Sequence, residues 1–115
     1  MHATLQIEIG EVKGKSQVIK FIGEFDKAGH SDIREVLDEA VKAFSGKTLV
    51  FDFGSLRFIN SEGIGYLMEI HTHLVNRDKK LVIVGPTSHV EDVFKTIGIS
   101  EIIDIYEDLE SFKNK

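Results

Sequence analysis

The sequence predicts an α/β fold with a mostly parallel central sheet, and three observations support this prediction. Short apolar runs of strand length alternate with longer segments whose apolar residues recur at helical spacing. The first two strand-like runs have no helix between them, which predicts an antiparallel hairpin at the N-terminal edge of the sheet. Each later strand is followed by a helical pattern, and such units form parallel sheets with helices packed on them. The predicted order of elements is ββαβαβαβα.

The N-terminal hairpin is the first predicted element. Apolar and polar residues alternate from Leu5 to Ile9, as in a half-exposed strand. Residues 11–16, which include Gly14, predict the hairpin loop. Residues 17–23 are more continuously apolar, so they predict a second strand that is buried more deeply than the first.

An amphipathic helix and a strand follow the hairpin. Apolar residues recur every three or four positions from Ile33 to Phe44, which is typical of a helix with one buried side. Ser31 is the predicted N-cap of this helix, and Gly46 is predicted to end it. Residues 48–53 are rich in β-branched and aromatic side chains and predict the third strand.

The second half of the chain continues the alternation. A second helix should end near residues 76–79, and its apolar side is formed by Ile64, Leu67, Met68, His71, Leu74 and Val75. Residues 81–84 form a continuous apolar run closed by Gly85-Pro86, as expected for a strand buried on both faces.

Three short elements are predicted to complete the chain. Ser88 and Glu91 have the spacing of a capping box for a third helix that ends at Gly98. Residues 101–105 predict a last strand, and a C-terminal helix should begin at about Asp108.

The length and the composition indicate one domain over residues 1–115. Apolar residues make up 42% of the chain and charged residues 29%, which is ordinary for a soluble globular protein. The formal charge of −5 disfavours binding to the phosphate backbone of nucleic acids. The chain has no cysteine, which excludes disulfides and thiolate metal sites and fits a reducing compartment, so we expect a cytoplasmic protein. We expect no membrane insertion, because no segment approaches the roughly 20 apolar residues of a membrane span. We expect no signal peptide, because the N-terminus lacks a cationic region followed by an apolar one.

The segment around Ser61 is the most informative part of the chain. Asn60 and Ser61 are expected on the turn between the third strand and the second helix, which places one hydroxyl in the first helical turn. A helix N-terminus carries free backbone N–H groups and a partial positive charge. Ser61 is therefore either a plain N-cap or a place where a phosphate is tolerated.

Two segments carry a resemblance to a known family. Gly23-Glu24-Phe25-Asp26 follows the second strand, and Asn60-Ser61-Glu62-Gly63-Ile64-Gly65 opens a helix. At these segments, and in the order of elements over nearly its whole length, the chain resembles the STAS domain family, most closely the free-standing bacterial anti-sigma factor antagonists.

The resemblance implies a function and a set of site residues. It implies a protein that binds a cytoplasmic anti-sigma factor with serine kinase activity and is switched off by phosphorylation of Ser61. The implied partner-binding residues are Asp26, Asn60, Ser61, Glu62, Gly63 and Ile64. It also implies a regulatory protein rather than an enzyme, with no cofactor of its own.

Two residues depart from the family pattern and keep an alternative open. Asn60 stands where the family usually has Asp, and Glu62 stands where Ser or Thr is common. The alternative is a scaffold that is not phosphorylated, such as the STAS subunit of a transporter or of a stressosome-like complex with other STAS proteins as partners.

Other chemistry has little support in the sequence. Ile59 occupies the place of the first glycine in a Gly-x-Ser-x-Gly elbow, so a hydrolase serine is not indicated. No phosphate-binding loop motif is present, and Gly63 and Gly65 are interpreted instead as room for a partner to approach. The carboxylates of Asp26, Asp52 and Glu62 could suit a hard cation, but nothing in the sequence brings them together, and no metal site is predicted.

Overall fold

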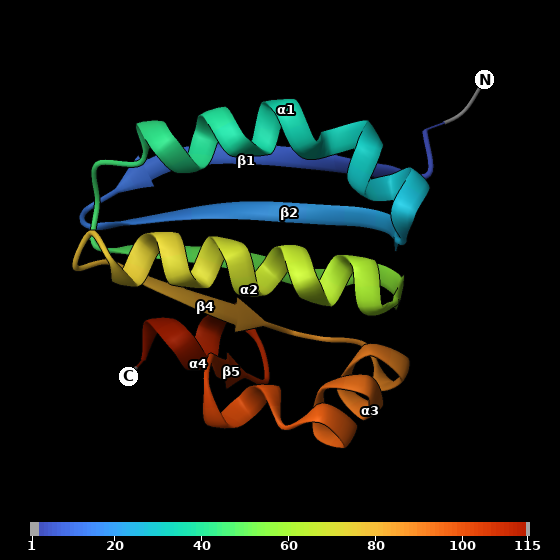
Figure 1. Cartoon of the computed structure of the whole chain (residues 1–115). Coiled ribbons are helices and arrows are strands. Elements are labelled where there is room, and N and C mark those ends of the chain that lie inside the picture. Colours follow the sequence, from blue (N-terminus) through green and yellow to red (C-terminus); the bar gives the residue numbers. More distant parts are fainter. Residues whose placement is uncertain (1–2, 115) are drawn as a thin grey trace.

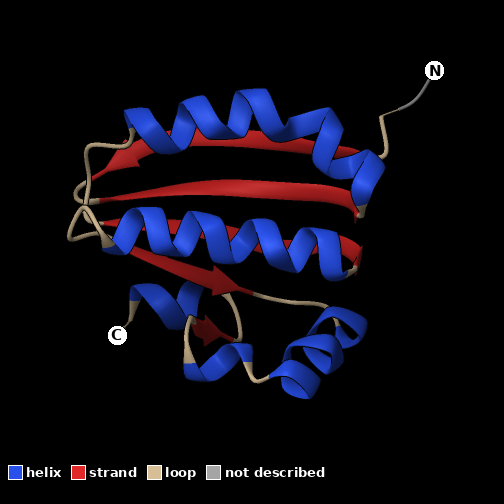
Figure 2. Ribbon diagram, viewed as in Figure 1, coloured by secondary structure: helices blue, strands red, loops and turns tan. Residues whose placement is uncertain are grey.

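A computed structural model describes residues 3–114 and shows a twisted sheet with helices packed on it (Figures 1 and 2). In chain order, its elements are β1 (Leu5–Lys13), β2 (Ser16–Phe25), α1 (Lys27–Ala43), β3 (Thr48–Ile59), α2 (Ser61–Val75), β4 (Lys80–Val84), α3 (Ser88–Ile97), the 3₁₀ helix η1 (Ile99–Glu101), β5 (Asp104–Tyr106) and α4 (Leu109–Lys113).

The sheet has the predicted topology. Its strand order is β1-β2-β3-β4-β5, with β1 and β2 antiparallel and every other neighbouring pair parallel. The predicted α/β class, the N-terminal edge hairpin and the order of strands and helices are therefore confirmed, and η1 is an addition.

The two faces of the sheet are covered unequally. In Figure 1, α1 and α2 lie side by side across one face, where the larger core cluster includes Phe21, Phe51 and residues of α1, α2 and α3. The other face holds a small cluster of Val50, Val82 and Val84, which is packed against α4. All the apolar residues of β4 are buried, because alternate side chains enter the two clusters, and this confirms the prediction of burial on both faces.

The hairpin turn is tighter than the sequence predicted. β1 continues to Lys13, which pairs with Ser16, so that only Gly14 and Lys15 form the turn. Gly14 has a φ of 62°, a left-handed conformation that glycine adopts without steric cost.

β3 is much longer than predicted and leads directly into α2. The prediction ended at Phe53, because Gly54 and Ser55 interrupt the apolar pattern, but the strand continues to Ile59. Its second half pairs with the end of β2, and two register shifts accommodate the extra residues of β3. Only Asn60 separates β3 from α2, which fixes the start of that helix to the end of the sheet.

The predicted N-cap of the first helix is wrong. α1 is capped by Asp26, and Ser31 lies within the helix. In sequence, Gly29 makes this segment look like a loop. In the structure it is a helical residue that lies against β2, where a Cβ atom would be 2.1 Å from the backbone oxygen of Glu24. Close approach of α1 to β2 therefore requires this glycine, despite its poor helix propensity. α1 ends at Ala43, before the predicted Gly46.

The C-terminal elements differ from the prediction in detail. The N-cap of α3 is Thr87, which makes no side-chain cap, so the predicted capping box of Ser88 and Glu91 is not formed. Gly98 ends α3 with a φ of 74°, as predicted, and Asp108 caps the C-terminal helix α4. β5 begins later than predicted because η1 occupies residues 99–101. No helix within residues 3–114 has both the length and the apolar character needed to cross a membrane.

Candidate functional site

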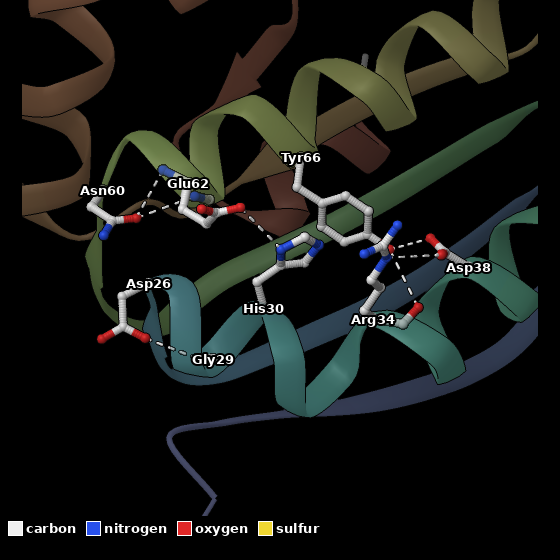
Figure 3. A network of polar contacts seen from close by, with 9 residues as sticks. Asp26, Gly29, His30, Arg34, Asp38, Asn60, Glu62 and Tyr66 are labelled. Atoms are coloured by element: carbon white, nitrogen blue, oxygen red, sulfur yellow. Dashed lines mark hydrogen bonds and ion pairs between the residues drawn. The ribbon is translucent and has the colours of Figure 1, made fainter.

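The candidate site is built on the ends of two paired strands. β2 and β3 run parallel and are paired as far as Phe25 and Ile59. The next residue of each strand caps a helix, Asp26 for α1 and Asn60 for α2. The backbone N–H of Asn60 also donates to the backbone oxygen of Phe25 at 3.2 Å. The N-termini of α1 and α2 therefore lie side by side (Figure 3), at one end of the molecule (Figure 1).

Two of the predicted polar residues at this end, Asp26 and Asn60, are helix caps. The Oδ1 atom of Asn60 accepts hydrogen bonds from the backbone N–H groups of Glu62 at 3.0 Å and Gly63 at 3.2 Å. The Oδ1 atom of Asp26 accepts from the N–H of Gly29 at 2.8 Å. These bonds satisfy backbone donors that a helix N-terminus otherwise leaves free, so both side chains position the helices.

Ser61 is the first residue of α2 and is exposed. Its hydroxyl forms no hydrogen bond with any other residue in the range 3–114. The interpretation of Ser61 as the N-cap is wrong, because Asn60 supplies the cap. One turn further along, Gly65 is exposed, and an added Cβ atom there would meet nothing within 4 Å, so the space beside Ser61 is open.

Gly63 faces inward more than the sequence suggested, whereas Ile64 packs against the core as its place on the apolar side of the helix predicted. Gly63 is buried, and an added Cβ atom would lie 2.6 Å from the backbone oxygen of Phe25. The interpretation of Gly63 as room for a partner is wrong, since the missing side chain makes room for β2. Ile64 is half-buried against the main core. The exposed part of the predicted surface is therefore formed mainly by Ser61 and Glu62.

Glu62 contacts a residue that the sequence analysis did not select. Its Oε2 atom lies 3.4 Å from the Nδ1 atom of His30 on α1. The His30 side chain is only 13% exposed, and its ring centroid lies 4.1 Å from that of Tyr66 on α2. His30 lies four residues after Asp26, about one helical turn from the N-cap of α1. This spacing could have placed His30 at the same end as Ser61 only if the start of α1 had been predicted correctly.

A second contact between the helices lies one turn further along. The Tyr66 hydroxyl donates to Asp38, and it lies 3.4 Å from the backbone oxygen of Arg34 (Figure 3). Burial of Tyr66 raises the pKa of its hydroxyl well above the ordinary value, and the hydrogen bond to Asp38 raises it further. Tyr66 therefore stays protonated and holds α1 against α2.

The site does not have the geometry of a serine nucleophile. Ser61, His30 and Glu62 line one open hollow together with Gly65, Tyr66 and Glu69. A nucleophilic serine needs a base within hydrogen-bond reach of its hydroxyl. His30 instead directs Nδ1 to Glu62, while its Nε2 atom is buried and has no hydrogen-bond partner among residues 3–114.

The acidic residues do not form a cation site. Within residues 3–114, no group of three or more histidine, cysteine or acidic side chains is arranged to hold a metal ion. Asp26 caps α1, and Asp52 accepts a hydrogen bond from the N–H of Gly54 at 2.9 Å, so each has a local structural role.

The comparisons with known proteins agree on one family. The sequence model of the STAS domain family matches residues 8–112. The anti-sigma-B factor antagonist of Listeria monocytogenes is 28% identical over 101 residues, which cover 88% of each chain. The anti-sigma F factor antagonist of Paenibacillus polymyxa is 22% identical and covers 90% of this chain and 87% of its own.

A solved structure has the same fold. An anti-sigma factor antagonist from Mycobacterium paratuberculosis matches with a TM-score of 0.81 and 18% identity, over 94% of this chain and 90% of the other. At this identity, the structural match supports the fold alone.

Proposed function

The chain belongs to the STAS domain family, and we propose that it acts as an anti-sigma factor antagonist. In this proposal, the unmodified protein binds a cytoplasmic anti-sigma factor that is also a serine kinase. Phosphorylation of Ser61 ends the binding. The names of its relatives from Listeria monocytogenes and Paenibacillus polymyxa support the assignment to this class.

The free hydroxyl of Ser61 is the observation that carries the proposal. It is exposed at the start of α2, it has no hydrogen bond to lose within residues 3–114, and the cap of the helix comes from Asn60. A phosphate can therefore be added without breaking a contact that holds the fold. A phosphoserine also suits the positive end of a helix.

The size of the charge change is sufficient for a switch. A phosphoserine carries about −1.5 to −2 charges near neutral pH. A like charge about 6 Å away in a partly desolvated interface costs roughly 2 to 3 kcal/mol per unit pair at an effective dielectric of 20. Since each 1.4 kcal/mol changes affinity tenfold, one phosphate weakens a complex by a factor of ten or more.

Phosphorylation by a candidate kinase tests the proposal. The purified protein is incubated with candidate anti-sigma factor kinases and ATP, and added phosphate is mapped by mass spectrometry. We expect one phosphate on Ser61. Ser61→Ala should bind the kinase constitutively, whereas Ser61→Asp should weaken binding about tenfold or more. Ser31→Ala is the matched control, because Ser31 is an exposed serine on the neighbouring helix α1.

The scaffold alternative gives a different result in the same experiment. The resident carboxylate of Glu62 favours it, because this half-exposed group already makes the surface beside Ser61 negative. A scaffold co-purifies with its partner in the presence and absence of ATP, and Ser61 stays unmodified. That outcome contradicts the switch.

A further inference from the structure

In the contact between His30 and Glu62, only one of the two ring nitrogens of His30 faces the carboxylate. The Nε2 atom of His30 is buried and has no partner within residues 3–114, while Nδ1 faces the Glu62 carboxylate at 3.4 Å. A neutral imidazole carries its proton on one nitrogen, and a buried N–H without an acceptor is costly. A neutral His30 is therefore expected to carry its proton on Nδ1, which faces the Glu62 oxygen.

His30 is held firmly enough to restrain an exposed carboxylate. Its ring packs between α1 and α2, and its centroid lies 4.1 Å from the ring centroid of Tyr66 and 6.5 Å from that of Phe25. The Glu62 side chain is 46% exposed, so without this contact it is free to change rotamer. Lys27 and Arg34 line the same side of the helix pair, but among the described residues only His30 pairs with Glu62.

An unrestrained Glu62 carboxylate would compete for the end of the helix at which Ser61 lies. The positive end of α2 attracts an anionic side chain in its first turn. A carboxylate drawn back to that end lies close to the hydroxyl of Ser61 and repels both an incoming phosphoryl group and the phosphoserine that results. Ser61, Glu62 and His30 line the same open hollow, so a carboxylate and a phosphoryl group there share one space.

The geometry points to His30 as a positioning residue that tethers the Glu62 carboxylate to α1 and keeps it away from Ser61. This inference rests on the proposed phosphorylation of Ser61 and adds a regulatory element to it. His30 does not touch the reacting atoms. It acts through Glu62, which explains how the chain accepts phosphate beside a residue of the same charge.

Two variants of His30 separate the tether from its packing. His30→Phe keeps an aromatic ring against Tyr66 and removes the donor. His30→Asn has an amide N–H close to the place of Nδ1, so it should restore the donor. Each is combined with Glu62→Gln, which removes the charge that the tether controls.

The rate of Ser61 phosphorylation by the kinase is measured for all combinations. We expect His30→Phe to slow phosphorylation roughly tenfold and His30→Asn to stay within about twofold of the wild type. In the Glu62→Gln background, His30→Phe should have no further effect. If His30→Phe slows the reaction equally in both backgrounds, His30 acts through packing and the inference is overturned.

A measurement without a kinase tests the tether independently of the proposed function. Long-range ¹H–¹⁵N NMR spectra of the imidazole nitrogens identify which nitrogen carries the proton. We expect His30 to be the Nδ1–H tautomer in the wild type. An Nε2–H tautomer in the wild type overturns the tether. A confirmed tautomer together with no kinase that modifies Ser61 contradicts the proposed function instead.

Discussion

At the scale of single residues, two glycines of α2 that look alike in sequence have opposite surroundings. Gly63 is buried against Phe25 and Ile59, whereas Gly65 faces open space. Their spacing suggested a common role in admitting a partner. Only Gly65 lies where a partner could approach, and Gly63 sets the distance between α2 and β2.

Alanine substitutions at the two glycines should change stability in opposite directions. Gly63→Ala forces a Cβ atom to within 2.6 Å of a backbone oxygen, so we expect a loss of about 1 to 3 kcal/mol. Gly65→Ala relieves a poor helix former without a clash and should add up to about 1 kcal/mol. Urea denaturation of both variants measures this. Equal effects at the two positions would show that burial of Gly63 does not determine its role.

The sequence predicted Ser61 more successfully than it predicted the surroundings of Ser61. The hydroxyl was placed in the first turn of a helix from local pattern alone, and the structure confirms this location. His30 was missed because its partner lies on another helix, 32 positions away in the chain. The contact depends on the distance between α1 and α2, which no local pattern encodes.

At the scale of elements, α1 and α2 act as a unit because polar contacts join them along their length. Tyr66 reaches from α2 to Asp38 on α1. Near the other end, Arg77, which lies just after the end of α2, donates to the backbone oxygen of Val41 on α1 at 3.3 Å. Such contacts keep the two helix N-termini, and with them Ser61, in a fixed relation.

The Tyr66 contact should make the helix pair sensitive to alkaline pH. The pKa of Tyr66 is raised in the folded state, so its contribution to stability is complete below the ordinary tyrosine pKa of about 10 and is lost as the pH rises above it. Tyr66→Phe loses this contribution and should cost about 1 kcal/mol at neutral pH. Its stability should then fall less steeply than that of the wild type above about pH 10.

Thermal unfolding of the wild type and Tyr66→Phe over this pH range makes the comparison. The difference between the two proteins removes the titration of lysines, which both share. Parallel stability curves would indicate that Tyr66 ionises in the folded protein as it does in the unfolded chain.

Element types followed from the sequence, while the N-caps of α1 and α3 did not. Local patterns predicted every α-helix and strand, though not η1, but the true N-caps were Asp26 instead of Ser31 and Thr87 instead of Ser88. In both helices, a serine near the true N-cap has a side chain that could equally well cap a helix. Pairing of β3 with β2 as far as Ile59 likewise depends on the neighbouring strand and not on local propensity.

At the scale of the whole molecule, the sheet divides the apolar interior into two clusters of different size. The larger lies under α1, α2 and α3, and the smaller is covered by α4 through Leu109 and Phe112. The ring of Phe112 packs edge-on against Tyr106 at a centroid distance of 5.5 Å. The small cluster therefore depends on one short helix.

Substituting alanine for one aromatic residue in each cluster should show that the two clusters contribute unequally to stability. Phe51→Ala removes a fully buried ring from the large cluster and should cost about 3 to 5 kcal/mol. Phe112→Ala removes a half-exposed ring and should cost roughly 1 to 2 kcal/mol, while exposing part of the sheet. Denaturation midpoints give the stabilities, and Lys113→Ala serves as the control in the same helix. If Phe112→Ala lost more stability than Phe51→Ala, α4 would be shown to be a main support of the fold.

The cap provided by Asn60 also affects how a modification at Ser61 could be reversed. Because the amides of Glu62 and Gly63 are already bonded to Asn60, they are not available to draw a phosphate inward. Under the proposed function, the ester would project into water beside Gly65, within reach of a phosphatase without any local unfolding. The rate of dephosphorylation would then depend on the amount of this phosphatase and not on opening of the folded domain. The time that the cell needs to recover after a signal would depend on the phosphatase in the same way.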